Sequence, residues 1–371
     1  MATRPRSERL PKRAPSSVLC RPKDLQTVEQ DARAPLSALV DQRAKARVPA
    51  APDSAWAKEY DGEMLPFTLG GHDIGTLALR AHTLTTPFTK LSSNLAVNQP
   101  AWDALPRETQ AVVIRAQPVG TGLSRLAFPP GSIRYVASCT ERYFVALDGS
   151  FHDYLQKFRA KARHNLKRTV HKFGDLSNGD IRCLQMCSPA EMGQFREFAI
   201  RISRNTWQER VGGPGFPRSE EFGMRIADLA VKGLARGVVL FHRDRPVSYA
   251  FCRAQDDCLL YARTAYDEAY AAWSPGRVLL YLLLERLFEE GKYRYLDFGE
   301  GTLPYKQFFS TGHSRCARII YFRRNSRNVA VVMGHWSLTT LSRCGGRVLE
   351  FLGLGDQVKS LTMGKMRRPG Q

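Results

Sequence analysis

The fold of this chain is decided by residues 274–309, SPGRVLLYLLLERLFEEGKYRYLDFGEGTLPYKQFF. Ser274 is a favoured N-cap residue, and Pro275 suits the first helical position because its missing N–H is not needed there. Gly291 suits the C-terminal cap, which favours a left-handed backbone. An almost wholly apolar run lies between these caps, so we predict a buried helix over residues 276–290.

A strand that ends in a glycine-flanked carboxylate follows this helix. Aromatic side chains predict the strand over residues 293–298, and it runs into the sequence DFGEG at 297–301. The pair Tyr305-Lys306 comes shortly afterwards. The first turn of the preceding helix has free backbone N–H groups and the positive end of the helix dipole, which suit a phosphate. A phosphate site and a carboxylate are therefore expected at the same end of one strand–helix–strand unit.

The composition argues against several protein classes. The chain has 371 residues, of which 43% are hydrophobic, enough for one large domain or two ordinary ones. No run approaches the roughly 18 consecutive apolar residues of a membrane span, and no charged-then-apolar leader opens the sequence. The eight cysteines lack CxxC spacing, which indicates reduced thiols and no metal site. We expect a cytoplasmic protein, with peripheral attachment at the inner membrane as an open alternative.

The formal net charge of +20 predicts attraction to polyanions, which include nucleic acid, anionic lipid and a phosphorylated cofactor. Residues 157–172 carry seven Lys or Arg residues and no acid, and their apolar spacing predicts an amphipathic helix over 150–173. Arg163 and Lys167 are our candidate substrate-binding residues on this helix. A solvated face is the alternative, and the partner stays open between a cofactor phosphate, a nucleotide-linked sugar and a membrane surface.

Four segments follow one another along the chain. Residues 1–58 are rich in Arg, Ala, Pro and Ser, and we expect a disordered basic tail. Residues 59–149 alternate short strand-like runs with turns and form a mixed first unit. Residues 150–325 form the second unit. Residues 326–371 combine apolar helical patches with basic residues, which predicts a basic amphipathic tail that either binds anionic lipid or packs on the protein.

The second unit contains the most regular pattern. Three strands are predicted at 237–242, 246–254 and 258–265, joined by tight turns. The capped helix and the strand ending in DFGEG come next, and a final strand is predicted at 318–323. This order defines a topology: an antiparallel meander is followed by a helix whose N-terminus suits a phosphate, and then by a diverging strand.

These elements, in this order, resemble the core of the GNAT acyltransferase superfamily. More narrowly, residues 150–325 resemble the cellulose-biosynthesis-type (CelD/BcsL) acetyltransferases and their FemAB-type relatives. The resemblance is carried by four features: the basic helix Phe158–Lys172, the segment from Tyr266 to Ser274-Pro275-Gly276, the Gly291 cap, and Asp297-Phe298-Gly299-Glu300-Gly301 followed by Tyr305-Lys306.

The resemblance implies an α+β protein with a tandem GNAT-like (acyl-CoA N-acyltransferase) fold, in which helices flank mixed, mostly antiparallel sheets. Residues 59–149 would be a degenerate N-terminal half, and residues 150–325 the acyltransferase domain. The resemblance implies acyl-CoA, most simply acetyl-CoA, as the co-substrate, and no metal. The family's pyrophosphate loop usually reads Arg/Gln-x-x-Gly-x-Gly/Ala, whereas Ala272–Arg277 contains a single glycine, so this loop is a sparse version.

Gly276 and Arg277 are our candidates for binding the cofactor phosphates, with Ser274 as cap and hydroxyl donor. An ordinary, well-capped core helix is the alternative interpretation of these three residues.

Acyl transfer needs a base that takes a proton from the acceptor and a group that protonates the leaving thiolate. Glu300 or Asp297 could serve as the base, although Asp297 could instead cap a turn or pair with Lys306. Tyr305 could protonate the thiolate or simply pack. Lys306 could hold a phosphate or carboxylate, or orient Asp297. Tyr266 follows the strand expected to line the cleft and is a candidate acceptor contact.

The leading hypothesis is an N- or O-acyltransferase that moves an acyl group from acyl-CoA to an amine or hydroxyl. The resemblance suggests a sugar or small amine as the acceptor, in envelope or exopolysaccharide synthesis. One alternative is a FemAB-type transferase that uses aminoacyl-tRNA, and nucleic acid is otherwise not expected as a partner. Another is a non-catalytic, membrane-associated scaffold with the same fold.

Overall fold

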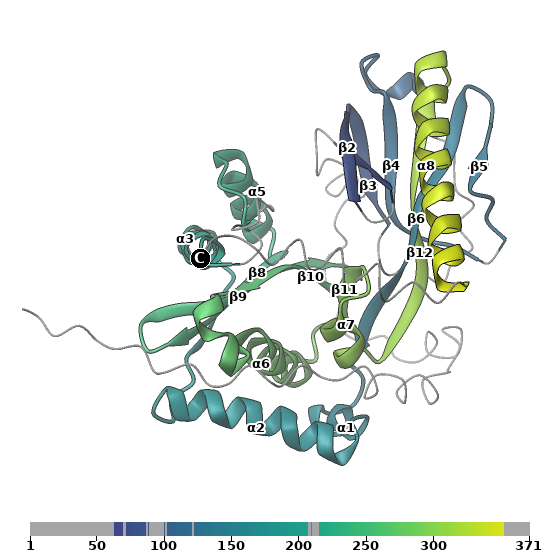
Figure 1. Ribbon diagram of the computed structural model, residues 1–371. Helices are drawn as coiled ribbons and strands as arrows, with labels where there is room; N and C mark the ends of the chain where they lie inside the picture. The colour runs from purple at the N-terminus through teal and green to yellow at the C-terminus, as the bar shows by residue number, and fades with distance from the viewer. Residues whose placement is uncertain are drawn as a thin grey trace, which may run out of the picture. The chain divides into compact units, whose positions relative to one another are not determined.

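The computed structural model describes residues 63–69, 72–86, 88, 100, 102–120, 122–206, 209 and 215–351, with backbone alone for 343–351 (Figure 1). The predicted tail 1–58 lies outside the described residues. Two compact units are present, one containing Glu141–Ser314 and the other combining Pro52–Thr140 with Arg315–Gln371. The units are thus not contiguous in sequence, and residues 315–325, which we had assigned to 150–325, group instead with the earlier segment.

The first unit is built on a sheet whose strand order is β6-β11-β10-β9-β8-β7. The strands are β6 (Ser132–Ala146), β7 (Cys183–Met186), β8 (Ala235–His242), β9 (Arg245–Gln255), β10 (Cys258–Tyr266) and β11 (Tyr295–Glu300). The predicted meander is confirmed, since β8–β9 and β9–β10 are antiparallel pairs. Positive φ angles of 53° at Arg243 and 52° at Asp256 form the two tight turns.

Helices cover both faces of this sheet. Figure 1 shows α2 (Ala160–Leu176) and α6 (Pro275–Glu290) on one side of β8–β10, with α3 (Pro189–Ser203) and α5 (Glu220–Val231) on the other. Coverage on both faces explains why β9 is buried along almost its whole length. The apolar run of α6 supplies much of the core and includes Val278, Leu279, Leu280, Leu283, Leu284 and Leu287.

The helix predicted over 150–173 is divided into α1 (Phe151–Gln156) and α2. A capping box between Ser150 and Asp153 starts α1. Lys157 follows α1, and its ammonium group donates hydrogen bonds to the backbone carbonyls of Phe309 and Ser310, at 2.5 and 2.6 Å. Phe309 is the last residue of α7 (Pro304–Phe309), and Ser310 is its C-cap. Lys157, which lies between α1 and α2, therefore holds the C-terminal end of α7.

In the second unit β1 (Glu63–Leu69) and β2 (His72–Leu79) form a hairpin. A sheet of order β3-β4-β12-β6 carries β5 on β6. Its other members are β3 (Ala81–Thr85), β4 (Ala111–Pro118), β5 (Leu126–Ala127) and β12 (Gly312–Arg323), and a short 3₁₀ turn, η5, spans Trp102–Ala104. In place of short runs alone, the later part of the predicted unit 59–149 contains one long strand, β6, of 15 residues.

The described part of the predicted C-terminal tail is one helix, α8 (Ser326–Phe351), which packs against β1. Val332 and His335 on α8 are buried. His335 Nδ1 lies 2.6 Å from the Tyr135 hydroxyl, and its Nε2 lies 3.1 Å from the Pro66 carbonyl oxygen. Residues 326–351 are therefore a packing element of this unit.

Among the described residues, no helix is both long enough and apolar enough to cross a membrane.

Candidate active site

The strands β10 and β11 run parallel but stay paired over only three residue pairs, from Cys258↔Tyr295 to Leu260↔Asp297. Beyond Leu260, β10 continues to Tyr266 paired with β9, and β11 continues to Glu300 beside β6. No strand of the described residues pairs with the β11-facing edge of β10 beyond Leu260. The strands part, and backbone N–H and C=O groups along this edge have no ladder partner.

An aromatic cluster lies where the two strands separate. The Phe298 ring is 5.8 Å from Tyr261 and 5.9 Å from Tyr305, between ring centroids. Tyr261 and Phe298 are buried, and Tyr305 is partly exposed. Burial raises the pKa of Tyr305 to about 12. Its hydroxyl is therefore protonated at neutral pH and can donate a hydrogen bond.

The start of α6 differs from our expectation for Ser274. This residue occupies the N-cap position, but its side chain makes no capping hydrogen bond. The reason is its left-handed backbone, with φ 50° and ψ 51°, which closes the preceding 3₁₀ turn η6 (Glu268–Trp273). A capping serine has an extended backbone instead. The predicted position of the cap is confirmed, and its predicted hydrogen bond is wrong.

The first turn of α6 also offers fewer free amides than the sequence suggested. Pro275 has no N–H, and the amides of Arg277 and Val278 both donate to the carbonyl of Ser274. Among these residues only the Gly276 amide has no hydrogen bond to the described part of the chain. An anion at this helix start would therefore meet one backbone donor and the exposed side chain of Arg277.

Tyr266 lies against the same helix start. A Cβ on Gly276 would be 3.5 Å from Cδ1 of Tyr266, so the tyrosine ring closely approaches the glycine backbone. Tyr266 is 42% exposed. The guanidinium carbon of Arg277 is 5.4 Å from the centroid of the Phe308 ring. The structure thus brings Tyr266, Gly276 and Arg277 together, and an amide beside an exposed arginine fits a phosphate ester.

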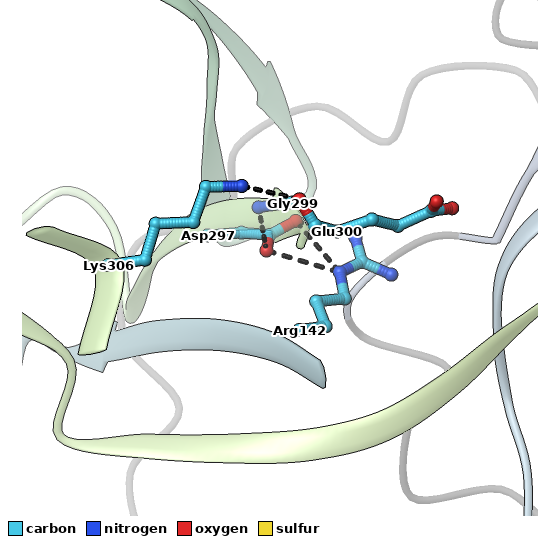
Figure 2. Close-up of polar contacts among 5 residues, drawn as sticks. All are labelled: Arg142, Asp297, Gly299, Glu300 and Lys306. Atoms are coloured by element: carbon cyan, nitrogen blue, oxygen red, sulfur yellow. Dashed lines mark hydrogen bonds and ion pairs between the residues drawn. The ribbon is translucent and has the colours of Figure 1, made fainter. Parts of the chain in front are cut away.

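The carboxylate of Asp297 is occupied by Arg142 from β6 (Figure 2). Nε of Arg142 is 3.1 Å from both carboxylate oxygens, and Nη2 is 2.6 Å from Oδ2. The two side chains are only 3% and 1% exposed. Oδ1 of Asp297 also accepts the Gly299 amide at 2.8 Å. The expected turn-capping role of Asp297 is confirmed, whereas its partner is Arg142 and not Lys306.

Lys306 holds the same turn from α7. Its Nζ donates to the backbone carbonyl of Glu300 at 2.5 Å, and the Gly301 amide donates to the carbonyl of Glu141 at 3.0 Å. Positive φ angles at Gly299 and Gly301, 68° and 101°, allow the sharp path of this turn. The backbone of residues 299–301 is fixed on both sides, and the Glu300 side chain projects from it.

The Glu300 carboxylate is the exception in this network. Its Oε1 is buried and makes no hydrogen bond to the described residues. Figure 2 shows the carboxylate pointing away from Lys306 and Asp297. An unpartnered buried carboxylate oxygen is unusual because its desolvation is not compensated. This oxygen is available to a ligand that brings a proton donor.

The basic helix reaches the same region through its C-terminal end. Nζ of Lys172 donates to the carbonyl of Ala272 at 3.2 Å, just before α6 begins. Arg163 is bonded to Gln156 and to the carbonyl of Phe158, whereas Lys167 is exposed. No cluster of His, Cys, Asp and Glu suited to a metal ion occurs among the described residues.

Arg142 is the residue of this site that sequence reasoning missed. It stands at the head of the apolar run 143–147, but nothing in the sequence distinguishes it among 55 Lys and Arg residues. The signal that could have found it is Asp297, since a carboxylate inside a predicted buried strand requires a cationic or hydrogen-bonding partner.

Residues 160–307, which run from α2 into α7, match the family model described as the acetyltransferase (GNAT) domain. No curated protein matches the sequence.

Solved structures with a similar fold include FemX, at 12% identity over 74% of this chain and 90% of that one, with a TM-score of 0.44. L-PGS from Bacillus licheniformis is 12% identical over 60% of this chain and 71% of its own, with a TM-score of 0.40. A tandem GNAT protein from the clavulanic acid biosynthesis pathway is 14% identical over 59% and 66%, with a TM-score of 0.35. The family match confirms the predicted GNAT fold: the chain contains a GNAT-type acetyltransferase domain, which supports an N-acyltransferase enzyme.

Proposed function

We propose that this protein transfers an acyl group, most simply acetyl, from acyl-CoA to an amine or hydroxyl. The observation that carries the proposal is the parting of β10 and β11 beyond Leu260, at the end of the sheet where α6 begins. Parted parallel strands leave backbone N–H groups that can stabilise the oxygen of a thioester carbonyl during attack.

The α6 start is the proposed phosphate-binding end of the site. The Gly276 amide and the Arg277 guanidinium would hold the phosphates of acyl-CoA, and the Ser274 hydroxyl, which caps no backbone group, is a further donor. Tyr266 lies against Gly276 and would line the path of the bound substrates.

Glu300 is the proposed general base, because its Oε1 is buried without a hydrogen-bond partner. The acceptor nitrogen or oxygen forms a bond to the acyl carbon, and its proton passes to Glu300 directly or through water. The bond from the acyl carbon to sulfur breaks, and the thiolate takes a proton from the Tyr305 hydroxyl or from solvent. Asp297 and Lys306 are proposed to position this turn rather than to react.

The acceptor is proposed to be a sugar or small amine in envelope or exopolysaccharide synthesis, at a cytoplasmic site with peripheral attachment to the inner membrane. The resemblance of residues 150–325 to CelD/BcsL-type acetyltransferases supports this choice. Lys167 and Arg163 on α2 would bind an anionic part of the acceptor, and the contact of Lys172 with Ala272 brings that helix to the site.

A second candidate function is aminoacyl-tRNA-dependent transfer. The single available amide at the α6 start makes a modest pyrophosphate site, and seven cations without an acid lie on residues 157–172. Binding of tRNA should then weaken steeply with salt, because phosphate neutralisation releases counterions.

The direct test is to incubate the full chain with acetyl-CoA and amine or sugar acceptors while following free thiol. We expect acceptor-dependent thiol release, and we expect the same assay with aminoacyl-tRNA in place of acetyl-CoA to give no product. Absence of coenzyme A binding by calorimetry at millimolar ligand would rule out the acyl-CoA proposal. Product from aminoacyl-tRNA alone would select the second candidate.

A further inference from the structure

Arg142 and Glu300 are direct neighbours across the β6–β11 ladder. Their Cα atoms are register partners in the antiparallel pair, just beyond a shift in the register between Asp297 and Glu300. Side chains at directly opposed positions lie on the same face, with Cβ atoms about 4.5–5.5 Å apart. Such a placement normally produces an Arg–Glu ion pair, because the guanidinium fork matches a carboxylate. Within the described part of the chain, Glu300 forms no such pair, and its Oε1 has no hydrogen-bond partner.

Asp297 explains why the pair is missing. It binds Arg142 through both carboxylate oxygens, and the contacts use Nε and Nη2 of the guanidinium. The carboxylate is fixed in turn by the Gly299 amide of its own turn. Figure 2 shows the guanidinium directed toward Asp297, while the Glu300 carboxylate extends away from both.

The other charged groups around this turn do not occupy Glu300 either. Lys306, from α7, donates to the Glu300 backbone carbonyl and not to its carboxylate. Glu141, the neighbour of Arg142 on β6, contributes its carbonyl to the Gly301 amide. Among the described cations near the turn, Lys306 is thus bound to the backbone. The orientation of the Arg142 guanidinium therefore determines whether the Glu300 carboxylate forms an ion pair.

We propose that Asp297 is a positioning residue that keeps Arg142 away from Glu300 and so leaves Glu300 able to accept a proton. The inference rests on the proposed function, in which Glu300 is the base. An arginine released from Asp297 would pair with Glu300. The pair would stabilise the ionised carboxylate, weaken it as a base and turn it from the acceptor.

An ordinary buried ion pair that only stabilises the fold would behave differently. In that case replacing both partners could restore stability, because no buried charge is left alone, but the pH profile of kcat in the folded single variant would stay unchanged. If Asp297 acts by restraining Arg142, removal of Arg142 should compensate for the loss of Asp297. Replacement of both charges by neutral side chains is often tolerated in buried pairs, so the double variant is a feasible protein.

The experiment compares Asp297→Asn, Asp297→Asn with Arg142→Met, and Glu300→Gln in the full chain. The readouts are kcat with acetyl-CoA, its pH profile, and thermal unfolding. Asp297→Asn should lower kcat by roughly 10²-fold and move the acid limb of the profile to lower pH. The double variant should recover at least tenfold of that loss and return the acid limb toward the wild-type position. Glu300→Gln should not be rescued by Arg142→Met.

A double variant that folds but is as inactive as Glu300→Gln would overturn the proposal, and so would an unchanged kcat in Asp297→Asn. If Asp297→Asn does not fold, the double variant alone decides, because restraint predicts a kcat within about tenfold of wild type. A crystal structure of Asp297→Asn gives a readout without catalysis: the Arg142 guanidinium should lie within hydrogen-bond distance of the Glu300 carboxylate. That result in a protein that transfers no acyl group would refute the proposed function and leave this inference standing.

Discussion

The two ends of the candidate site are built with opposite degrees of constraint. At the α6 start, Gly276 offers one amide, Arg277 is exposed, and Tyr266 is 42% exposed. At the turn 299–301, a buried Arg142–Asp297 pair and Lys306 fix the backbone from both sides. In the proposed function, the first end would contribute binding energy, which tolerates mobility. The second end would hold a reacting group in place, which requires a rigid support.

The largest effect should come from Glu300→Gln. If the rigid end performs the proton transfer, kcat should fall on the order of 10²- to 10⁴-fold, because a positioned general base contributes that much. The KM for acetyl-CoA should change little, since the phosphate end is untouched. Steady-state thiol release measures both constants. If kcat/KM fell by the same factor through a rise in KM alone, Glu300 would be a substrate-binding residue, and the two ends of the site would not differ in function.

The support of the rigid end should appear as stability. Asp297→Ala removes the carboxylate that binds the buried Arg142 guanidinium, and a new contact with Glu300 would restore only part of that interaction, so the free energy of unfolding should fall by up to about 3–5 kcal/mol. Denaturant unfolding measures it. Asp228→Ala is the matched control, because its pair with Lys232 is 59% and 50% exposed and should contribute no more than about 1 kcal/mol. Similar losses in both variants would show that the buried pair gives no special support.

The open end should respond through KM. Arg277→Ala removes one exposed cation from the phosphate end and should raise the KM for acetyl-CoA by roughly tenfold with kcat nearly unchanged. Arg286→Ala is the control on the same helix, since that side chain is 59% exposed and pairs with Glu289 and Glu290. A fall in kcat without a change in KM would assign Arg277 to the chemistry instead.

The smallest effect concerns the pH dependence of stability in the second unit. Burial lowers the pKa of His335 in the folded protein. The unfolded chain therefore binds the proton more readily, so this stability is present above the ordinary value of about 6.5 and is lost as the pH falls through the folded value. His335→Gln should flatten that acid loss in thermal unfolding. An unchanged pH slope would show that His335 titrates normally.

Local patterns predicted the elements of the first unit well. The apolar run, Pro275 in the first turn and the C-cap Gly291 specify α6 because they act within a single helix. The strands of the meander were predicted because short turns with typical turn residues separate them. A turn after Asp297 could also be predicted from the sequence, because Gly299 and Gly301 permit positive φ angles that other residues rarely adopt.

Contacts between distant segments could not be predicted in the same way. Arg142 lies 155 residues from Asp297 along the chain, and only the β6–β11 pairing brings them together. Ser274 has the correct residue type for a cap, yet the preceding 3₁₀ turn gives it a left-handed backbone that withdraws its side chain. The contact of Lys157, between α1 and α2, with the Phe309 carbonyl likewise joins residues 152 positions apart.

The central claim is that binding at α6 and proton transfer at Glu300 are separate functions of one site. The most direct measurement is calorimetric titration of acetyl-CoA into Glu300→Gln, beside thiol release by the same protein. The account predicts a Kd within about twofold of wild type together with loss of acceptor-dependent thiol release. The claim would be contradicted if Glu300→Gln no longer bound acetyl-CoA, or if it released thiol as fast as the wild-type protein.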